Sequence, residues 1–220
     1  MNRLSRLVIG SCLIASSSLF AGSFSFTGNF SQDDNIRYFT FNLASPATVT
    51  ILTLAYGGGI NAASLTIPQG GFDPLVALFA GLLTPTGDLQ SLNNDGGCGN
   101  VGQDSVTNAC WDSFISVPLG IGNYTVALLQ SDNGPLGSTL GDGFLRTGEG
   151  NFTGPAFVGS PGSFWDANPN QRTSAFALDI INVNSAADVS IPEPGSLLLM
   201  AGGLLLAGLQ AGFRRKVGRS

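Results

Sequence analysis

Apolar and polar residues alternate with a period of two along much of the chain, the pattern of strands that bury one face. Gly, Asn, Asp and Pro separate the successive runs and mark turns. The runs occupy residues 24–30, 36–43, 47–54, 75–80, 113–119, 124–131 and 175–183. No long stretch follows the 3.6-residue period of an amphipathic helix. The pattern therefore predicts an all-β fold, an antiparallel β-sandwich that is jelly-roll-like.

Two segments interrupt this pattern. Residues 132–172 are rich in Gly, Asn and Pro and are long for a single loop, so they either hide short strands or form a lid. Residues 184–190 have the composition of a flexible linker. We therefore expect the sandwich to occupy residues 22–183, with the linker at 184–190.

The first residues have the order of a secretory signal peptide. Arg3 and Arg6 precede a mostly apolar stretch at 7–20, and small residues follow it. This order predicts a signal peptide at residues 1–21. Two alternatives are a lipoprotein acylated at Cys12 and an N-terminal helix that is retained.

The other end carries an apolar run from Leu197 to Phe213, near the lower limit for crossing a bilayer. The run predicts a transmembrane helix at about 196–213. Cations follow it and should stay on the cytoplasmic side, which places the body of the chain outside. These cations are Arg214, Arg215 and Lys216. The alternative is a buried core helix, although the run has no amphipathic face.

A Pro-Glu-Pro triplet, Pro192, Glu193 and Pro194, precedes the apolar run. Proline favours extended conformations in the residue before it, so the triplet is a stiff, extended peptide of the kind a protease needs. Triplet, apolar span and basic cluster together, over residues 191–216, resemble the PEP-CTERM sorting signal of Gram-negative bacteria. This resemblance implies recognition and cleavage by an exosortase, a membrane-embedded protease. It also implies transient residence in the inner membrane and then delivery to the surface or extracellular matrix of bacteria that make exopolysaccharide.

Residues 65–131 bear a second resemblance, to bacterial pre-peptidase C-terminal domains. The matching residues are Phe72-Asp73, Leu78-Phe79, Asn94-Asp95-Gly96, Asp112-Ser113 and 122–126. That family implies a β-sandwich that accompanies secreted enzymes as an accessory module. This chain differs because Asn93 and Asn94 replace some of the usual acids and because no enzyme domain accompanies the module.

Charge is distributed unevenly. Residues 22–190 contain 13 of the 14 acidic residues but only three of the nine basic ones, a net charge of 3 − 13 = −10. Such a body repels nucleic-acid phosphates, so we expect no nucleic-acid partner. It is compatible with bound cations and with solubility outside the cell.

Residues 22–190 contain neither His nor Lys, so they offer few of the side chains that enzymes use for catalysis. The usual general base for a Ser or Cys nucleophile and the amine of a Schiff base are therefore missing. We expect a non-enzymatic surface or extracellular-matrix protein. The alternative is a polysaccharide-binding module, with or without calcium, and the third hypothesis is a glycoside hydrolase that uses two carboxylates.

Three groups of residues are candidates for binding or cross-linking. Cys98 and Cys110 predict a disulfide in an exported chain, with two free thiols as the alternative. Trp165 is a candidate platform for stacking on a glycan. Clusters of Asp and Asn side chains supply the oxygen ligands that Ca²⁺ prefers. The alternative is that these residues are present only because they favour turns. These candidate calcium ligands are Asp33, Asp34, Asp73, Asn94 and Asp95.

Overall fold

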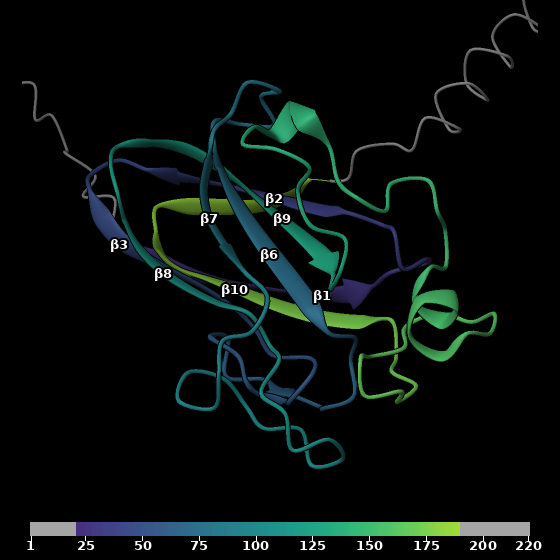
Figure 1. Ribbon diagram of the computed structural model, residues 1–220. Helices are drawn as coiled ribbons and strands as arrows, with labels where there is room; N and C mark the ends of the chain where they lie inside the picture. The colour runs from purple at the N-terminus through teal and green to yellow at the C-terminus, as the bar shows by residue number, and fades with distance from the viewer. Residues whose placement is uncertain (1–20, 190–220) are drawn as a thin grey trace, which may run out of the picture.

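The computed structural model describes residues 21–189, which form two β-sheets packed face to face (Figure 1). The four-stranded sheet has the order β1 (Gly22–Asn29), β10 (Ala175–Val183), β3 (Ala47–Thr53) and β8 (Phe114–Leu119). The five-stranded sheet has the order β11 (Ser185–Val189), β2 (Arg37–Leu43), β9 (Gly122–Gln130), β6 (Pro74–Ala80) and β7 (Leu89–Asn93). A small third sheet pairs β4 (Gly59–Ile60) with β5 (Thr66–Ile67). All of these strand pairs are antiparallel, which confirms the predicted all-β fold.

The chain passes from one large sheet to the other at nearly every connection, and only the β6–β7 hairpin stays within one of them. Eight of the strands thereby take the order of a jelly roll. The ninth, β11, is an additional edge strand beside β2. The whole sorting motif, the predicted transmembrane helix and all of the predicted signal peptide except residue 21 lie outside the described residues. Residues 21–189 contain no helix long and apolar enough to cross a membrane.

The main core lies between the two large sheets and follows from the two-residue alternation. In β2, Phe39, Phe41 and Leu43 are buried while the residues between them are half-buried. The rings of Phe26 in β1 and Phe39 are 4.9 Å apart between centroids, so they join the two sheets. Burying each such side chain contributes about 1.5–3 kcal/mol.

Part of the 132–172 segment covers the outer face of the five-stranded sheet. Phe144 packs there on Leu75, Ala77 and Phe79 of β6 and forms a second apolar cluster. Strand β6 is therefore buried on both faces, which explains its continuous apolar sequence. Within 132–172 the structure has two short helical turns, η1 (Leu140–Asp142) and η2 (Gly154–Val158), and isolated bridges in place of strands.

The prediction of a linker at 184–190 needs correction, because Ser185–Val189 form β11. This strand pairs with β2 over its whole length, and Asp188 makes an ion pair with Arg37 at 2.7 Å. Ala186 packs against the main core. The folded domain therefore extends from residue 22 to 189 rather than ending at 183.

Four long connections gather at one end of the sandwich, which we call the loop end. The strand register places the last residues of β1, β3, β7 and β9 at this end. The connections that form it are 30–36, 54–73, 94–113 and 131–174. All the candidate calcium, glycan and disulfide residues lie in these connections.

Candidate functional site at the loop end

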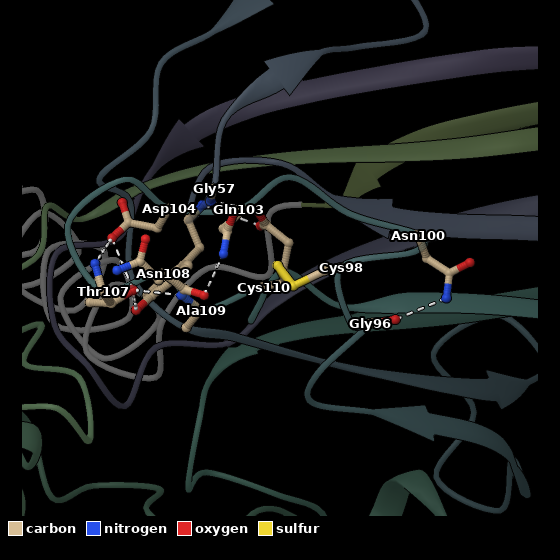
Figure 2. The surroundings of a disulfide bond; sticks show 12 residues. Gly57, Gly96, Cys98, Asn100, Gln103, Asp104, Thr107, Asn108, Ala109 and Cys110 are labelled. Carbon is tan, nitrogen blue, oxygen red and sulfur yellow. Dashed lines mark hydrogen bonds between the residues drawn. A yellow bond between two sulfur atoms is a disulfide. The ribbon is translucent and has the colours of Figure 1, made fainter.

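A disulfide joins Cys98 to Cys110 within the 94–113 connection, as predicted (Figure 2). The two Cα atoms are 5.0 Å apart, and Cys110 is buried. Inside the loop that it closes, the Asp104 amide donates a hydrogen bond to the Ala109 carbonyl at 2.9 Å. The cross-link and this hydrogen bond together hold Asp104 in place.

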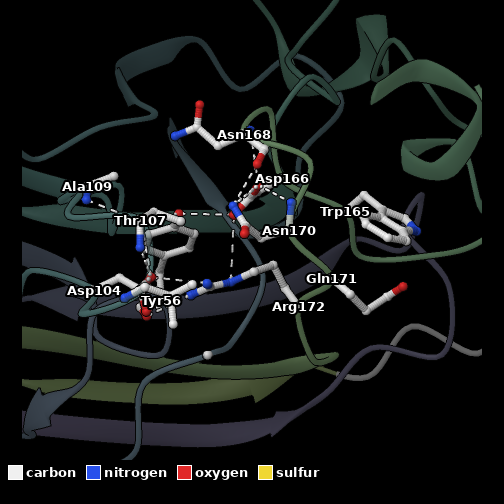
Figure 3. Close-up of polar contacts among 12 residues, drawn as sticks. Tyr56, Asp104, Thr107, Ala109, Trp165, Asp166, Asn168, Asn170, Gln171 and Arg172 are labelled. Carbon is white, nitrogen blue, oxygen red and sulfur yellow. Dashed lines mark hydrogen bonds and ion pairs between the residues drawn. The ribbon is translucent and has the colours of Figure 1, made fainter. Parts of the chain in front are cut away.

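Asp104 faces a buried arginine that reaches it from a distant part of the chain (Figure 3). Arg172 donates from Nη2 to Asp104 Oδ1 at 3.1 Å and from Nη1 to Oδ2 at 3.2 Å. It also donates to the backbone carbonyls of Tyr56 and Gly71. This single guanidinium thus ties together the 54–73, 94–113 and 131–174 connections.

The carboxylate of Asp104 is held in its charged form. Burial raises the pKa of Asp104, but hydrogen bonds from Arg172 and Thr107 more than offset this, so its pKa lies below the usual value. Neighbouring Asp166 accepts a hydrogen bond from the Tyr56 hydroxyl at 3.1 Å and one from the Asn170 amide at 2.9 Å. Sequence analysis singled out neither Arg172 nor its partners. The available signal was that Arg172 is one of only three basic residues in an acidic, lysine-free domain.

Asp112 holds the chain as it leaves β3. It accepts hydrogen bonds from the Thr53 hydroxyl at 2.8 Å, the Tyr56 amide at 3.2 Å and the Gly57 amide at 2.7 Å. Burial raises the pKa of Asp112 despite these hydrogen bonds. Its visible role is to position the 54–73 connection.

The acidic pair Asp33 and Asp34 holds the 131–174 connection. Buried Asp33 accepts hydrogen bonds from the Thr153 amide at 2.9 Å, the Phe164 amide at 2.7 Å and the Thr153 hydroxyl. Asp34 Oδ2 accepts from the amides of Gly148 and Gly150. These contacts give both side chains a structural role in loop attachment.

The other three candidate calcium ligands gather where β6 begins and β7 ends. The Ser113 hydroxyl lies 2.8 Å from the carbonyl oxygens of both Pro74 and Asn93, which brings the neighbours of those residues together. These neighbours are Asp73, Asn94 and Asp95. Burial raises the pKa of Asp73 well above its usual value, and the charge of Asp95 raises it further.

The structure thus divides the five candidates into two sets with different partners. Across residues 21–189, no group of three or more acidic or cysteine side chains is arranged to hold a metal ion. Calcium binding by all five residues has no direct support in this arrangement and stays a prediction.

Trp165 is half-buried, and its ring points away from Arg172 and Asp166 in Figure 3. Its backbone amide donates to the Thr153 hydroxyl at 2.9 Å. The indole nitrogen is buried beside Gly162 and has no hydrogen-bond partner in the described part of the chain. The proposed role of Trp165 in glycan stacking stays a prediction.

Comparison with known families locates the sorting signal. The family model described as the PEP-CTERM protein-sorting motif matches residues 190–216. Comparison with curated proteins gave no match. The resemblance of 65–131 to pre-peptidase C-terminal domains is compatible with the antiparallel sandwich but is not confirmed. The chain therefore carries, at residues 190–216, the PEP-CTERM sorting motif of an exosortase substrate.

Proposed function

We propose that the protein is a non-enzymatic component of the cell surface or extracellular matrix. It crosses the inner membrane, is held there transiently and is released when an exosortase cuts near the Pro-Glu-Pro triplet. The observation that carries this proposal is the sorting motif at residues 190–216. The disulfide between Cys98 and Cys110 supports it, because disulfides persist in oxidising compartments outside the cytoplasm.

The arrangement of charged groups supports a structural role. At the loop end, Arg172 and Asp104 pair with each other, while Asp112 and Asp33 accept hydrogen bonds from neighbouring connections. These side chains are used to hold loops against the sandwich. An acidic, disulfide-linked domain suits a protein that persists in a hydrated polysaccharide matrix.

The decisive experiment compares the native protein with Glu193→Ala in its own host. Intact mass and membrane fractionation report cleavage and location together. We expect the wild type to appear outside the inner membrane without the residues that follow the cut, and Glu193→Ala to stay full-length in that membrane. Glu149→Ala is the matched control, since Glu149 is an exposed surface residue of the folded domain.

The control variant should be processed like the wild type. If wild type and Glu193→Ala both remain full-length in the inner membrane, the C-terminal segment is a permanent anchor and the proposal fails. If both are cut and released, Glu193 is not required for processing and the motif does not act as proposed.

A further inference from the structure

Two side-chain oxygens at the junction of β6 and β7 lack hydrogen-bond partners within residues 21–189. They are Asp73 Oδ1 and Asn94 Oδ1, and both atoms are buried. Asp73 as a whole is only 5% exposed. A buried polar atom without a partner costs free energy, so two such oxygens in one place indicate a missing positive or hydrogen-bonding group.

The antiparallel register brings these atoms to one end of the β6–β7 pair. Val76 of β6 is opposite Asn93 of β7, so the chain before Val76 runs beside the chain after Asn93. The Ser113 hydroxyl holds the two segments together from the adjoining connection. The amide oxygen of Asn94 has no hydrogen-bond partner within residues 21–189 and is therefore available.

The electrostatic surroundings favour a cation at this place. Asp95, Asp166 and Asp112 act on Asp73 with like charge, in addition to its burial. Arg172, which is also at the loop end, is engaged by Asp104 through two hydrogen bonds. The side chain of Ser131 lowers the pKa of Asp73, but it does not offset burial and like charge. The negative charge is therefore only partly compensated by the described residues.

We propose that Asp73, Asn94 and Asp95 bind a calcium ion at the end of the β6–β7 pair. Calcium accepts carboxylate, amide and water oxygens in flexible geometry, which suits two carboxylates, one amide and bound water. Asp33 does not take part, because both of its oxygens hold the 131–174 connection. Asp34 Oδ1 also has no partner within residues 21–189, but Asp34 lies in the separate 30–36 connection and is held through Oδ2 by the amides of Gly148 and Gly150.

The small number of charged ligands sets the expected affinity for calcium. Sites of extracellular modules bind calcium with Kd of about 10⁻⁴–10⁻³ M, and a site with two carboxylates belongs in this weak class. The ion would join the start of β6 to the connection that carries the disulfide. This inference goes beyond the proposed sorting function and does not depend on it.

The test titrates calcium chloride into the purified, chelator-treated full-length protein. Calorimetry measures Kd, and thermal unfolding measures the shift in Tm. We expect calcium to raise Tm, and Asp95→Asn to weaken binding by about tenfold or more. Asp95 is exposed, so its variant should fold, whereas Asp73→Asn is a second, isosteric variant of the buried ligand.

Two controls locate the site. Asp88→Asn removes an exposed acid from the opposite end of β7 and should bind calcium like the wild type. Asp34→Asn should also keep its affinity for calcium, even if the protein becomes less stable. Circular dichroism of each variant verifies its fold.

Three results would overturn the proposal. One is no binding and no change in Tm at about 10 mM calcium, a concentration that saturates even weak extracellular sites. Another is unchanged affinity in Asp95→Asn. The third is loss of affinity in Asp34→Asn alone, which would place the ion elsewhere. None of these results bears on whether Glu193→Ala is cleaved. The calcium proposal and the sorting proposal can therefore fail independently of each other.

Discussion

The guanidinium carbon of Arg172 lies 4.1 Å from the centre of the Tyr56 ring. Both side chains are buried, and a cation–π contact in such surroundings contributes about 2 kcal/mol or more. The contact joins the 54–73 connection to the 131–174 connection, and Asp104 supplies the balancing negative charge. The stability of the loop end therefore depends on a few buried groups that are far apart in sequence.

Replacing Arg172 should cost much of the domain's stability. We expect Arg172→Gln to lower the free energy of unfolding by about 3–5 kcal/mol, because Asp104 is left charged and buried without its partner. Urea unfolding measures the difference. Arg37→Gln is the matched control, since the ion pair of Arg37 with Asp188 is at the surface and contributes about 0–1 kcal/mol. Equal effects of the two substitutions would contradict this view.

Removing the disulfide should weaken the same end of the domain. We expect the double variant Cys98→Ser, Cys110→Ser to lose about 2–3 kcal/mol, because the short loop gains freedom in the unfolded chain. Urea unfolding of the variant, and of the wild type before and after reduction, measures the loss. A reduced wild type as stable as the oxidised one would show that the cross-link contributes nothing.

Asp73 and Asp104 should give opposite pH dependences, because their pKa values shift in opposite directions. The folded-state pKa of Asp73 is raised above its unfolded value of about 3.9. Its contribution to stability is therefore present below about pH 4 and is lost as pH rises through the folded pKa. In calcium-free buffer, Asp73→Asn should gain stability relative to the wild type between pH 4 and pH 7.

Asp104 is the contrasting case, since its folded-state pKa is lowered. Its contribution is present above the unfolded pKa and is lost as pH falls through the folded one. The stability deficit of Asp104→Asn should therefore shrink as the solution becomes acidic. Urea unfolding at several pH values measures both differences. Parallel pH profiles for the two variants would contradict the assignment.

The large strands could be predicted because the apolar pattern within each strand indicates which of its faces are buried. Strand β2 alternates between Phe39, Phe41 and polar residues, and β6 is continuously apolar because both of its faces are covered. Strands β7 and β11 were missed because Leu89–Asn93 and Ser185–Val189 have weak patterns. Strand β7 is held by backbone hydrogen bonds to β6, which has a much stronger apolar pattern than β7 itself. Strand β11 is held in the same way by β2, which lies far away in sequence.

The loop end was less predictable because its contacts are long-range. Arg172 is 68 residues from Asp104, and Asp33 is 120 residues from Thr153. Two adjacent carboxylates in a turn look the same in sequence whether they bind a cation or accept backbone N–H bonds. The Cys98–Cys110 pair was predictable because an exported chain with two remaining cysteines offers one pairing.

Strand β11 bears on what is left after proteolysis. It ends at Val189, and the sorting motif begins at the next residue. Because Glu193 follows Val189 in the chain, a cut near Glu193 would leave β11 in the shed domain as its outermost strand. Strand β2 would remain paired on both sides and would not become an open edge able to recruit another chain. Release from the membrane would then carry no risk of edge-to-edge aggregation through β2.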